Sequence, residues 1–149
     1  MTEESINVSE ILKNTKVAVS PETFAIVSLT AEKWAALLND ASLSPRMTAP
    51  FLIFKDRHEV TLVLDEVDLK NMRPGLAEAK LANGYRMLTF ETVLDLDVVG
   101  FMAAVSRILA DAGVPILPIS AFSRDHVLIR QTDLAKALKA LGPLVAELC

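Results

Sequence analysis

Apolar and polar residues in the second half of the chain follow first a strand pattern and then a helix pattern. Residues 86–92 are apolar, aromatic or β-branched, which predicts a strand. From Val98 apolar side chains recur at helical spacing up to Gly113, a residue typical of a helix C-terminus. Two short β-type runs and a second helical stripe follow at residues 115–122, 126–130 and 134–148. The predicted order is β-α-β-β-α, a split βαβ unit of the ferredoxin-like kind.

The first half of the chain shows the same order of patterns. Residues 23–29 predict a strand, and Thr30 is a typical N-cap for a helix that reaches Leu38. Two β-type runs and a stretch of helical composition follow at residues 49–54, 59–64 and 67–80. We expect Pro74-Gly75 to split or kink the last of these elements.

A comparison of the two halves indicates an internal repeat. An offset of 65 positions places Pro115 on Pro50 and Asp133-Leu134 on Asp68-Leu69 without a gap. The strand at 86–92 would close the first sheet and open the second, because the chain otherwise ends before a final strand. The sequence therefore predicts an α+β fold with two ferredoxin-like βαββαβ units in tandem that share or exchange strands. We divide it into an N-terminal extension (1–16), a first unit (17–83) and a second unit (84–149), and residues 5–12 are either a short amphipathic turn or loose.

Composition narrows the class of protein. The 149 residues are 52% apolar and 23% charged, which is typical of a soluble globular protein, and no apolar run is long enough for a membrane span. A net charge of −4 without a Lys/Arg cluster argues against nucleic acid as a partner. The single cysteine, Cys149, gives no disulfide framework, and the acidic first residues lack the features of a signal peptide. We expect a cytoplasmic protein.

Three motifs occur in order across the second half: Asp97-Val-Val-Gly100 at a strand-to-helix junction, the run 108–116 and the run 120–129. Together they resemble the ACT domain, and more closely a tandem-ACT group that includes small uncharacterised ACT proteins and the cytosolic arginine sensor CASTOR. The resemblance implies a regulatory domain that binds a small ligand, usually an amino acid, at an interface between ACT units. Because ACT units commonly pair, it also implies a homodimer.

The strand-to-helix junction has the chemistry to hold an α-amino acid. The first N–H groups of a helix and the positive end of its dipole attract a carboxylate. Asp95 or Asp97 would meet the α-ammonium group, while Gly100, near the third helical position, would permit close approach of the ligand. In the alternative interpretation Asp97 is only an N-cap and Gly100 only lets the helix pack closely.

The resemblance places a second wall of the site on the strand that follows. Ser120 and Phe122 would share one strand face and line a pocket, whereas the alternative is a half-buried strand with Phe122 in the core. The predicted ligand-binding residues are Asp95, Asp97, Val98, Val99, Gly100, Phe101, Ser120 and Phe122.

No pattern in the sequence indicates catalysis, a metal or a cofactor. Asp125 and His126 are neighbours on a predicted strand and would point to opposite faces, so they do not form a triad with Ser120. The two histidines lack metal-ligand spacing, no glycine-rich phosphate loop is present, and Asp65 and Asp68 are expected to cap a helix. We therefore expect an amino-acid-binding regulatory protein. A ligand-free protein-interaction module is the alternative, and a small enzyme on the same scaffold ranks third.

Overall fold

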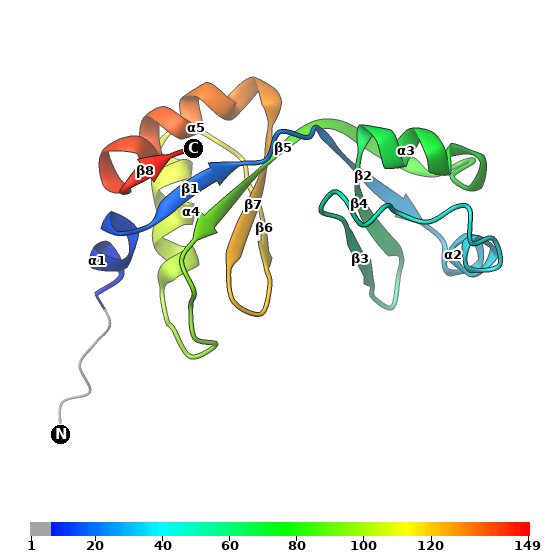
Figure 1. The fold of residues 1–149 in the computed structure, drawn as a ribbon, viewed down its shortest axis with the longest axis horizontal. Helices are drawn as coiled ribbons and strands as arrows, with labels where there is room; N and C mark the ends of the chain where they lie inside the picture. The colour runs from blue at the N-terminus through cyan, green and yellow to red at the C-terminus, as the bar shows by residue number, and fades with distance from the viewer. Residues whose placement is uncertain (1–6) are drawn as a thin grey trace. The chain divides into compact units, whose positions relative to one another are not determined.

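The computed structural model describes residues 7–149 and divides them into two compact units. Residues 22–85 form one unit, which we call the inserted unit. Residues 7–21 and 86–149 form the other, which we call the terminal unit. Figure 1 labels the elements of both. The first six residues of the predicted extension lie outside the described part of the chain.

The inserted unit has the predicted order of elements, and its strands pair antiparallel in the order β3-β4-β2-β5. Thr30 caps α2 as predicted, because its side chain accepts a hydrogen bond from the Lys33 amide. The predicted helix over 67–80 is wrong in extent, because Pro74-Gly75 ends it in a 3₁₀ turn. Its elements are β2 (Phe24–Leu29), α2 (Ala31–Leu38), β3 (Leu52–Lys55), β4 (Val60–Asp65), α3 (Glu66–Met72), the 3₁₀ turn η1 (Arg73–Gly75) and the first half of β5 (Lys80–Glu91).

The terminal unit has the strand order β6-β7-β5-β1-β8. Strand β1 pairs antiparallel with β5, and β8 pairs parallel with β1. Its elements are α1 (Val8–Lys13), β1 (Lys16–Val19), the second half of β5, α4 (Phe101–Asp111), β6 (Leu117–Ser120), β7 (Asp125–Arg130), η2 (Gln131–Asp133), α5 (Leu134–Leu141), η3 (Gly142–Leu144) and β8 (Glu147–Leu148).

Strand β5 belongs to both units. Residues 80–85 pair with β2 in the inserted unit, and residues 88–91 pair with β1 in the terminal unit, where β5 also pairs with β7. The prediction of a shared strand is therefore confirmed, although the strand begins earlier than the predicted residue 86.

The predicted boundaries at residues 17 and 84 differ from those in the structure. Strand β1 pairs with residues 88–91, so residues 16–19 belong with the second half of the chain rather than with the first. The expectation that no strand follows the last helix is wrong, because β8 does so. The N-terminal segment that was expected to be a turn or loose forms helix α1 over Val8–Lys13.

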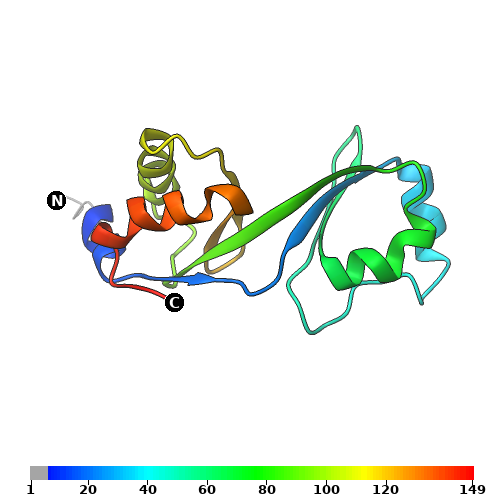
Figure 2. The ribbon, with the colours of Figure 1, turned by 90° about the horizontal axis from the view of Figure 1, so that it is seen from above.

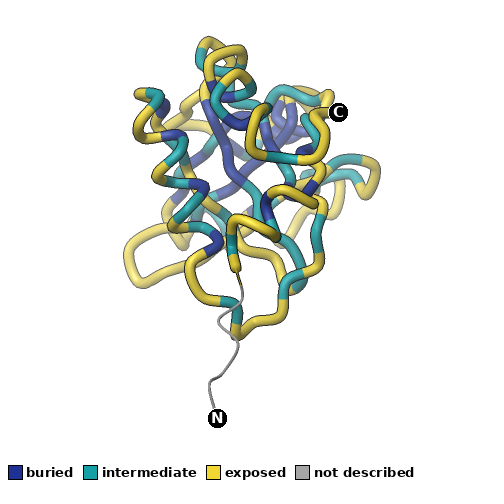
Figure 3. Tube along the Cα trace, turned by 90° about the vertical axis from the view of Figure 1, so that its left-hand side faces the viewer, coloured by how far each residue is buried: buried dark blue, intermediate teal, exposed yellow. Residues whose placement is uncertain are grey.

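Helices α1, α4 and α5 cover one face of the terminal sheet. Figure 2 shows α4 and α5 on the same side of β1 and β5. Their apolar side chains pack with strand residues in one core, which includes Val17, Phe90, Phe101, Val105 and Ile129. Figure 3 shows how the buried positions concentrate inside the fold while the connecting loops stay exposed. No helix among residues 7–149 has the length and apolarity to cross a membrane.

Candidate functional site

A cavity of about 290 Å³ opens in the terminal unit between the loop that leads into α4 and the β6–β7 turn. The Leu94 amide donates to the Ser123 carbonyl over 2.8 Å and ties the two segments together. The cavity is lined by residues 94–96, Val98, residues 100–103 and residues 120–125.

The N-terminus of α4 faces this cavity without a capping side chain. Gly100 is the N-cap residue, with a left-handed φ of 92°, and no side chain bonds to the first turn. The first helical hydrogen bond runs from the Ala104 amide to the Gly100 carbonyl over 3.0 Å. The amides of residues 101–103 precede that bond, and the same residues line the cavity. An anion is the natural partner of such a helix start.

The two candidate carboxylates differ in the hollows that they line. Asp95 lines the main cavity, and its carbonyl accepts a hydrogen bond from the Val98 amide in a tight turn. Asp95 and Asp97 both line an adjacent hollow of about 400 Å³, and Asp97 does not reach the main cavity. The interpretation of Asp97 as the N-cap is wrong, because the helix begins three residues later than predicted, after Gly100. A left-handed residue interrupts the helical dihedral pattern, so the apolar spacing from Val98 overstated the helix.

The opposite wall comes from the end of β6 and the turn after it. The Ser120 hydroxyl lines the cavity and donates to Asp125 Oδ1 over 2.8 Å. The strand ends at Ser120, so Phe122 lies on the turn, 81% exposed, and the interpretation of Phe122 as a core residue is wrong.

The structure brings most of the predicted site residues together, with Asp97 and Val99 as the exceptions. Val99 is 85% exposed and lines neither hollow. Sequence reasoning missed residues 123–125, which were assigned only to a hairpin connection, although they line the cavity.

The polar lining of the cavity consists of two acids, one arginine and two serines. Asp95 and Asp125 both line it, and Arg124 Nε lies 3.2 Å from Glu91 Oε2 without hydrogen-bond alignment. His126 faces elsewhere, because its Nδ1 is 2.8 Å from Thr89 Oγ1, and burial lowers its pKa. The Ser120 hydroxyl is bonded to Asp125, and His126 is bonded to Thr89. Ser120 and His126 therefore do not form a nucleophile–base pair.

Comparison with known families finds a match within the chain. The family model for the ACT domain matches residues 80–142, which contain the whole cavity lining. We refer to the matched segment as the ACT domain. ACT domains are typically regulatory domains that bind amino acids. No curated protein matches the chain.

Solved structures share the fold over most of the chain. A protein from Agrobacterium tumefaciens is 20% identical with a TM-score of 0.70, over 91% of this chain and 92% of that one. A protein of unknown function from Vibrio cholerae, described as a possible transport protein, is 23% identical with a TM-score of 0.65, over 90% and 93%. The regulatory subunit of aspartate kinase from Thermus flavus is 17% identical with a TM-score of 0.65, over 89% and 98%.

These likenesses establish an α+β fold with βαββαβ units of the ACT type. The predicted resemblance to the ACT domain is thus confirmed for residues 80–142. The narrower resemblance to the CASTOR group, with a tandem of ACT domains, stays a prediction.

The cavity of the ACT domain has a counterpart in the inserted unit. A hollow of about 320 Å³ lies beside the N-terminus of α2. Five of its lining residues stand at the 65-position offset from lining residues of the ACT-domain cavity: Leu29 and Leu94, Thr30 and Asp95, Lys33 and Val98, His58 and Ser123, Glu59 and Arg124. The start of α2 differs, because Thr30 caps it with its own side chain.

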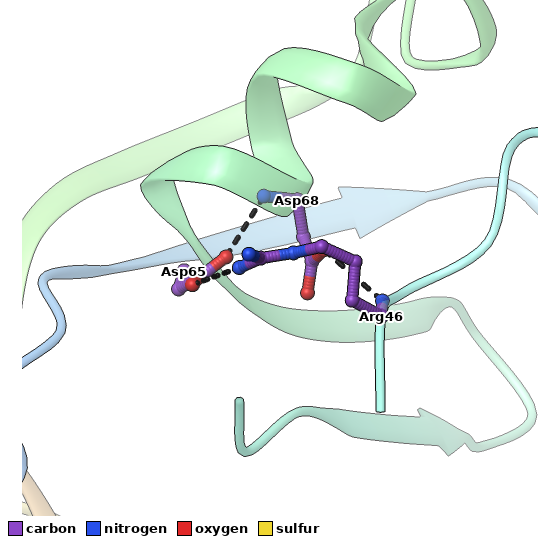
Figure 4. Close-up of polar contacts among 3 residues, drawn as sticks. All are labelled: Arg46, Asp65 and Asp68. Carbon is purple, nitrogen blue, oxygen red and sulfur yellow. Dashed lines mark hydrogen bonds and ion pairs between the residues drawn. The ribbon is translucent and has the colours of Figure 1, made fainter. Parts of the chain in front are cut away.

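The other pair of carboxylates, Asp65 and Asp68, binds an arginine. Asp65 caps α3 as expected, but Asp68 is not a cap: its Oδ1 accepts from the Arg46 amide at 3.1 Å and from Arg46 Nε at 2.8 Å. Arg46 Nη2 also pairs with Asp65, and Figure 4 shows the guanidinium between the two acids. The hydrogen bond with Asp68 is the main cause that raises the pKa of Arg46. This cluster fastens a loop to α3 and presents no open cavity of its own.

Among residues 7–149, no group of three or more His, Cys, Asp or Glu side chains is placed to hold a metal ion.

Proposed function

We propose that the ACT domain binds a free amino acid and acts as a regulatory domain without catalytic residues. One observation carries the proposal: α4 begins at an uncapped Gly100 and opens into a cavity of about 290 Å³ with Asp95 on its wall. The amides of residues 101–103 would hold the α-carboxylate, and Asp95 would hold the α-ammonium group. Asp97, assigned to the site by sequence, would act only through the adjacent hollow.

The regulatory step would use the two walls of the cavity. A ligand that touches both the α4 N-terminus and the β6–β7 turn would favour an arrangement with the two walls close together over one with the walls apart. The shift of this equilibrium would be set by the difference in the ligand's affinity for the two arrangements. Within the walls, the Leu94–Ser123 hydrogen bond already links the two segments.

Exposed apolar side chains at the cavity loops support association with a second copy of the chain. Val93, Leu96, Val99 and Phe122 are 66%, 73%, 85% and 81% exposed and lie on the loops that flank the cavity. Such side chains are normally covered when they gather on one surface. A homodimer would cover them, and sedimentation velocity with and without ligand would detect it. The same surface favours the alternative function, a protein-interaction module that needs no ligand.

A thermal-unfolding screen against the twenty amino acids tests the proposal. A ligand at a hundred times its Kd adds about 2.7 kcal/mol, which raises the midpoint of a chain of this size by roughly 5–11 °C. We expect one amino acid, or one class, to produce such a rise. No rise with any of the twenty would favour the interaction module instead.

Two matched variants locate the bound ligand. Asp95→Asn removes the charge that would pair with the ammonium group, and we expect roughly 10- to 100-fold weaker binding in isothermal titration. Asp97→Asn is the control, because it makes the same substitution at a residue outside the main cavity. This variant should bind the amino acid with nearly the affinity of the wild type. Equal affinities of the Asp95 variant and the wild type would contradict the proposed site.

A further inference from the structure

Lys33 reaches from α2 to the turn that precedes β5 in the inserted unit. Its Nζ donates to the Ala77 carbonyl oxygen at 2.5 Å and lies 3.2 Å from Glu78 Oε2. The Lys33 side chain is 33% exposed and lines the hollow of about 320 Å³ described above. The ammonium group thus lies on the wall of a hollow that stays open with the lysine in place.

The turn that receives Lys33 holds an uncommon backbone conformation. Glu78 has a φ of 64° and is the one residue other than glycine with a positive φ among residues 7–149. A left-handed conformation at such a residue costs free energy and persists only where the surroundings hold it in place. Here it lets one turn present both the Ala77 carbonyl and the Glu78 carboxylate to the same cation.

A carbonyl oxygen and a carboxylate side by side suit a primary ammonium group. That group carries three N–H donors and a full charge, so it can satisfy both acceptors at once. At the 65-position offset Lys33 corresponds to Val98, which has no polar side-chain group to offer to its own cavity. The two hollows therefore share aligned lining positions but differ in whether an ammonium group of the chain lines them.

We propose that the Ala77 carbonyl and Glu78 form a binding site for primary ammonium compounds, and that Lys33 occupies it within the same chain. In the wild-type protein Lys33 would then take up both acceptors of the turn, while the hollow beside them stays open. This inference does not depend on amino-acid binding by the ACT domain, because it concerns a different unit.

A plain surface ion pair is the competing interpretation of the same contacts. Exposed pairs between lysine and glutamate contribute little, and Glu78 is 86% exposed on its side chain. Such a pair would leave no preformed receptor once Lys33 is removed. The two interpretations therefore differ in what a vacated site binds.

Replacement of Lys33 with alanine, followed by addition of n-propylammonium, distinguishes them. Lys33→Ala deletes the last three carbons and the ammonium group of the side chain, and n-propylammonium supplies the same atoms. We expect saturable shifts of the Ala77, Glu78 and Ala79 amide resonances in this variant and none in the wild type. The uncharged analogue n-propanol should leave the same resonances unchanged.

A second substitution tests the carboxylate. Glu78→Gln in the Lys33→Ala background should weaken the binding of n-propylammonium about tenfold, because a charged hydrogen bond becomes a neutral one. If the alanine variant does not fold, Lys33→Met keeps the stem and is titrated with the ammonium ion. Absence of binding in a folded Lys33 variant, or equal shifts in the wild type, would overturn the proposal.

Discussion

At the scale of the residue, a few polar groups decide what each cavity can accept. Gly100 leaves the start of α4 open to the cavity, whereas Thr30 closes the start of α2 with its own hydroxyl. Val98 brings no charged group to one hollow, whereas Lys33 brings an ammonium group to the wall of the other. Single side chains at the helix starts thus give the two hollows different capacities for a ligand.

His126 makes the stability of the protein sensitive to pH. Burial lowers its pKa below the ordinary 6.5, against the opposite influence of Asp125 and Glu91, while Arg124 lowers it further. Between the folded pKa and 6.5 the unfolded chain therefore binds more protons, so the free energy of unfolding falls as the pH falls through that window. We expect His126→Gln to lose less stability than the wild type between neutral and mildly acidic pH.

Urea titrations at a series of pH values measure this effect. His126→Gln also loses the contact with Thr89, which lowers its free energy of unfolding by the same amount at every pH. Only the change of that free energy with pH therefore tests the role of His126. Parallel curves for the two proteins would contradict the assignment.

At the scale of the element, Arg46 fastens the loop that joins α2 to β3. It lies in that loop and binds two buried acids at the start of α3. Asp68 is fully buried, and its Oδ2 has no hydrogen-bond partner among the described residues. The guanidinium group and the backbone amide of Arg46 therefore both tie the loop to the helix.

Arg46→Met should destabilise the inserted unit strongly, because it leaves two buried carboxylates without a cation. We expect a lower thermal midpoint and faster proteolysis within residues 39–51. Arg46→Lys keeps the positive charge but loses the forked geometry of the guanidinium group. Its thermal midpoint should therefore lie between those of the wild type and Arg46→Met. A midpoint of Arg46→Met equal to that of the wild type would show that the anchor is dispensable.

At the scale of the whole molecule, segments from both ends of the described chain belong to the same unit. Strand β1 supplies the neighbour of β5, and Leu12 and Val17 enter the core of the terminal unit. The segment 86–149 by itself therefore lacks part of its sheet and part of its core.

Dissection of the terminal unit tests this dependence. We expect residues 86–149 alone to give a poorly dispersed amide spectrum, because an exposed strand edge and an incomplete core destabilise the fold. A permuted chain in which a flexible linker joins residue 149 to residue 7, and which ends at residue 21, should give a dispersed spectrum. A folded fragment 86–149 would show that the N-terminal segment is not needed.

Local pattern in the sequence determined most of the elements and part of the site. Periodicity and turn residues predicted the β-α-β-β-α order of both halves, and Thr30 marked the start of α2. These features are set by residues that are close together in the sequence, so the sequence alone is enough to predict them. The junction at Gly100 was predicted from the same local pattern and the wall at Ser120 from the resemblance to the ACT domain, and both residues line the cavity.

Only the tertiary structure decided the features that depend on residues far apart in the chain. The pairing of Lys16–Val19 with β5, the clasp of Arg46 on Asp68 and the reach of Lys33 to Ala77 have no signal in local periodicity. The same holds for Asp97 and Phe122, whose places were set by a left-handed glycine and by the length of a strand. Long-range pairing is chosen by the energy of the whole fold, which the order of residues along one element does not reveal.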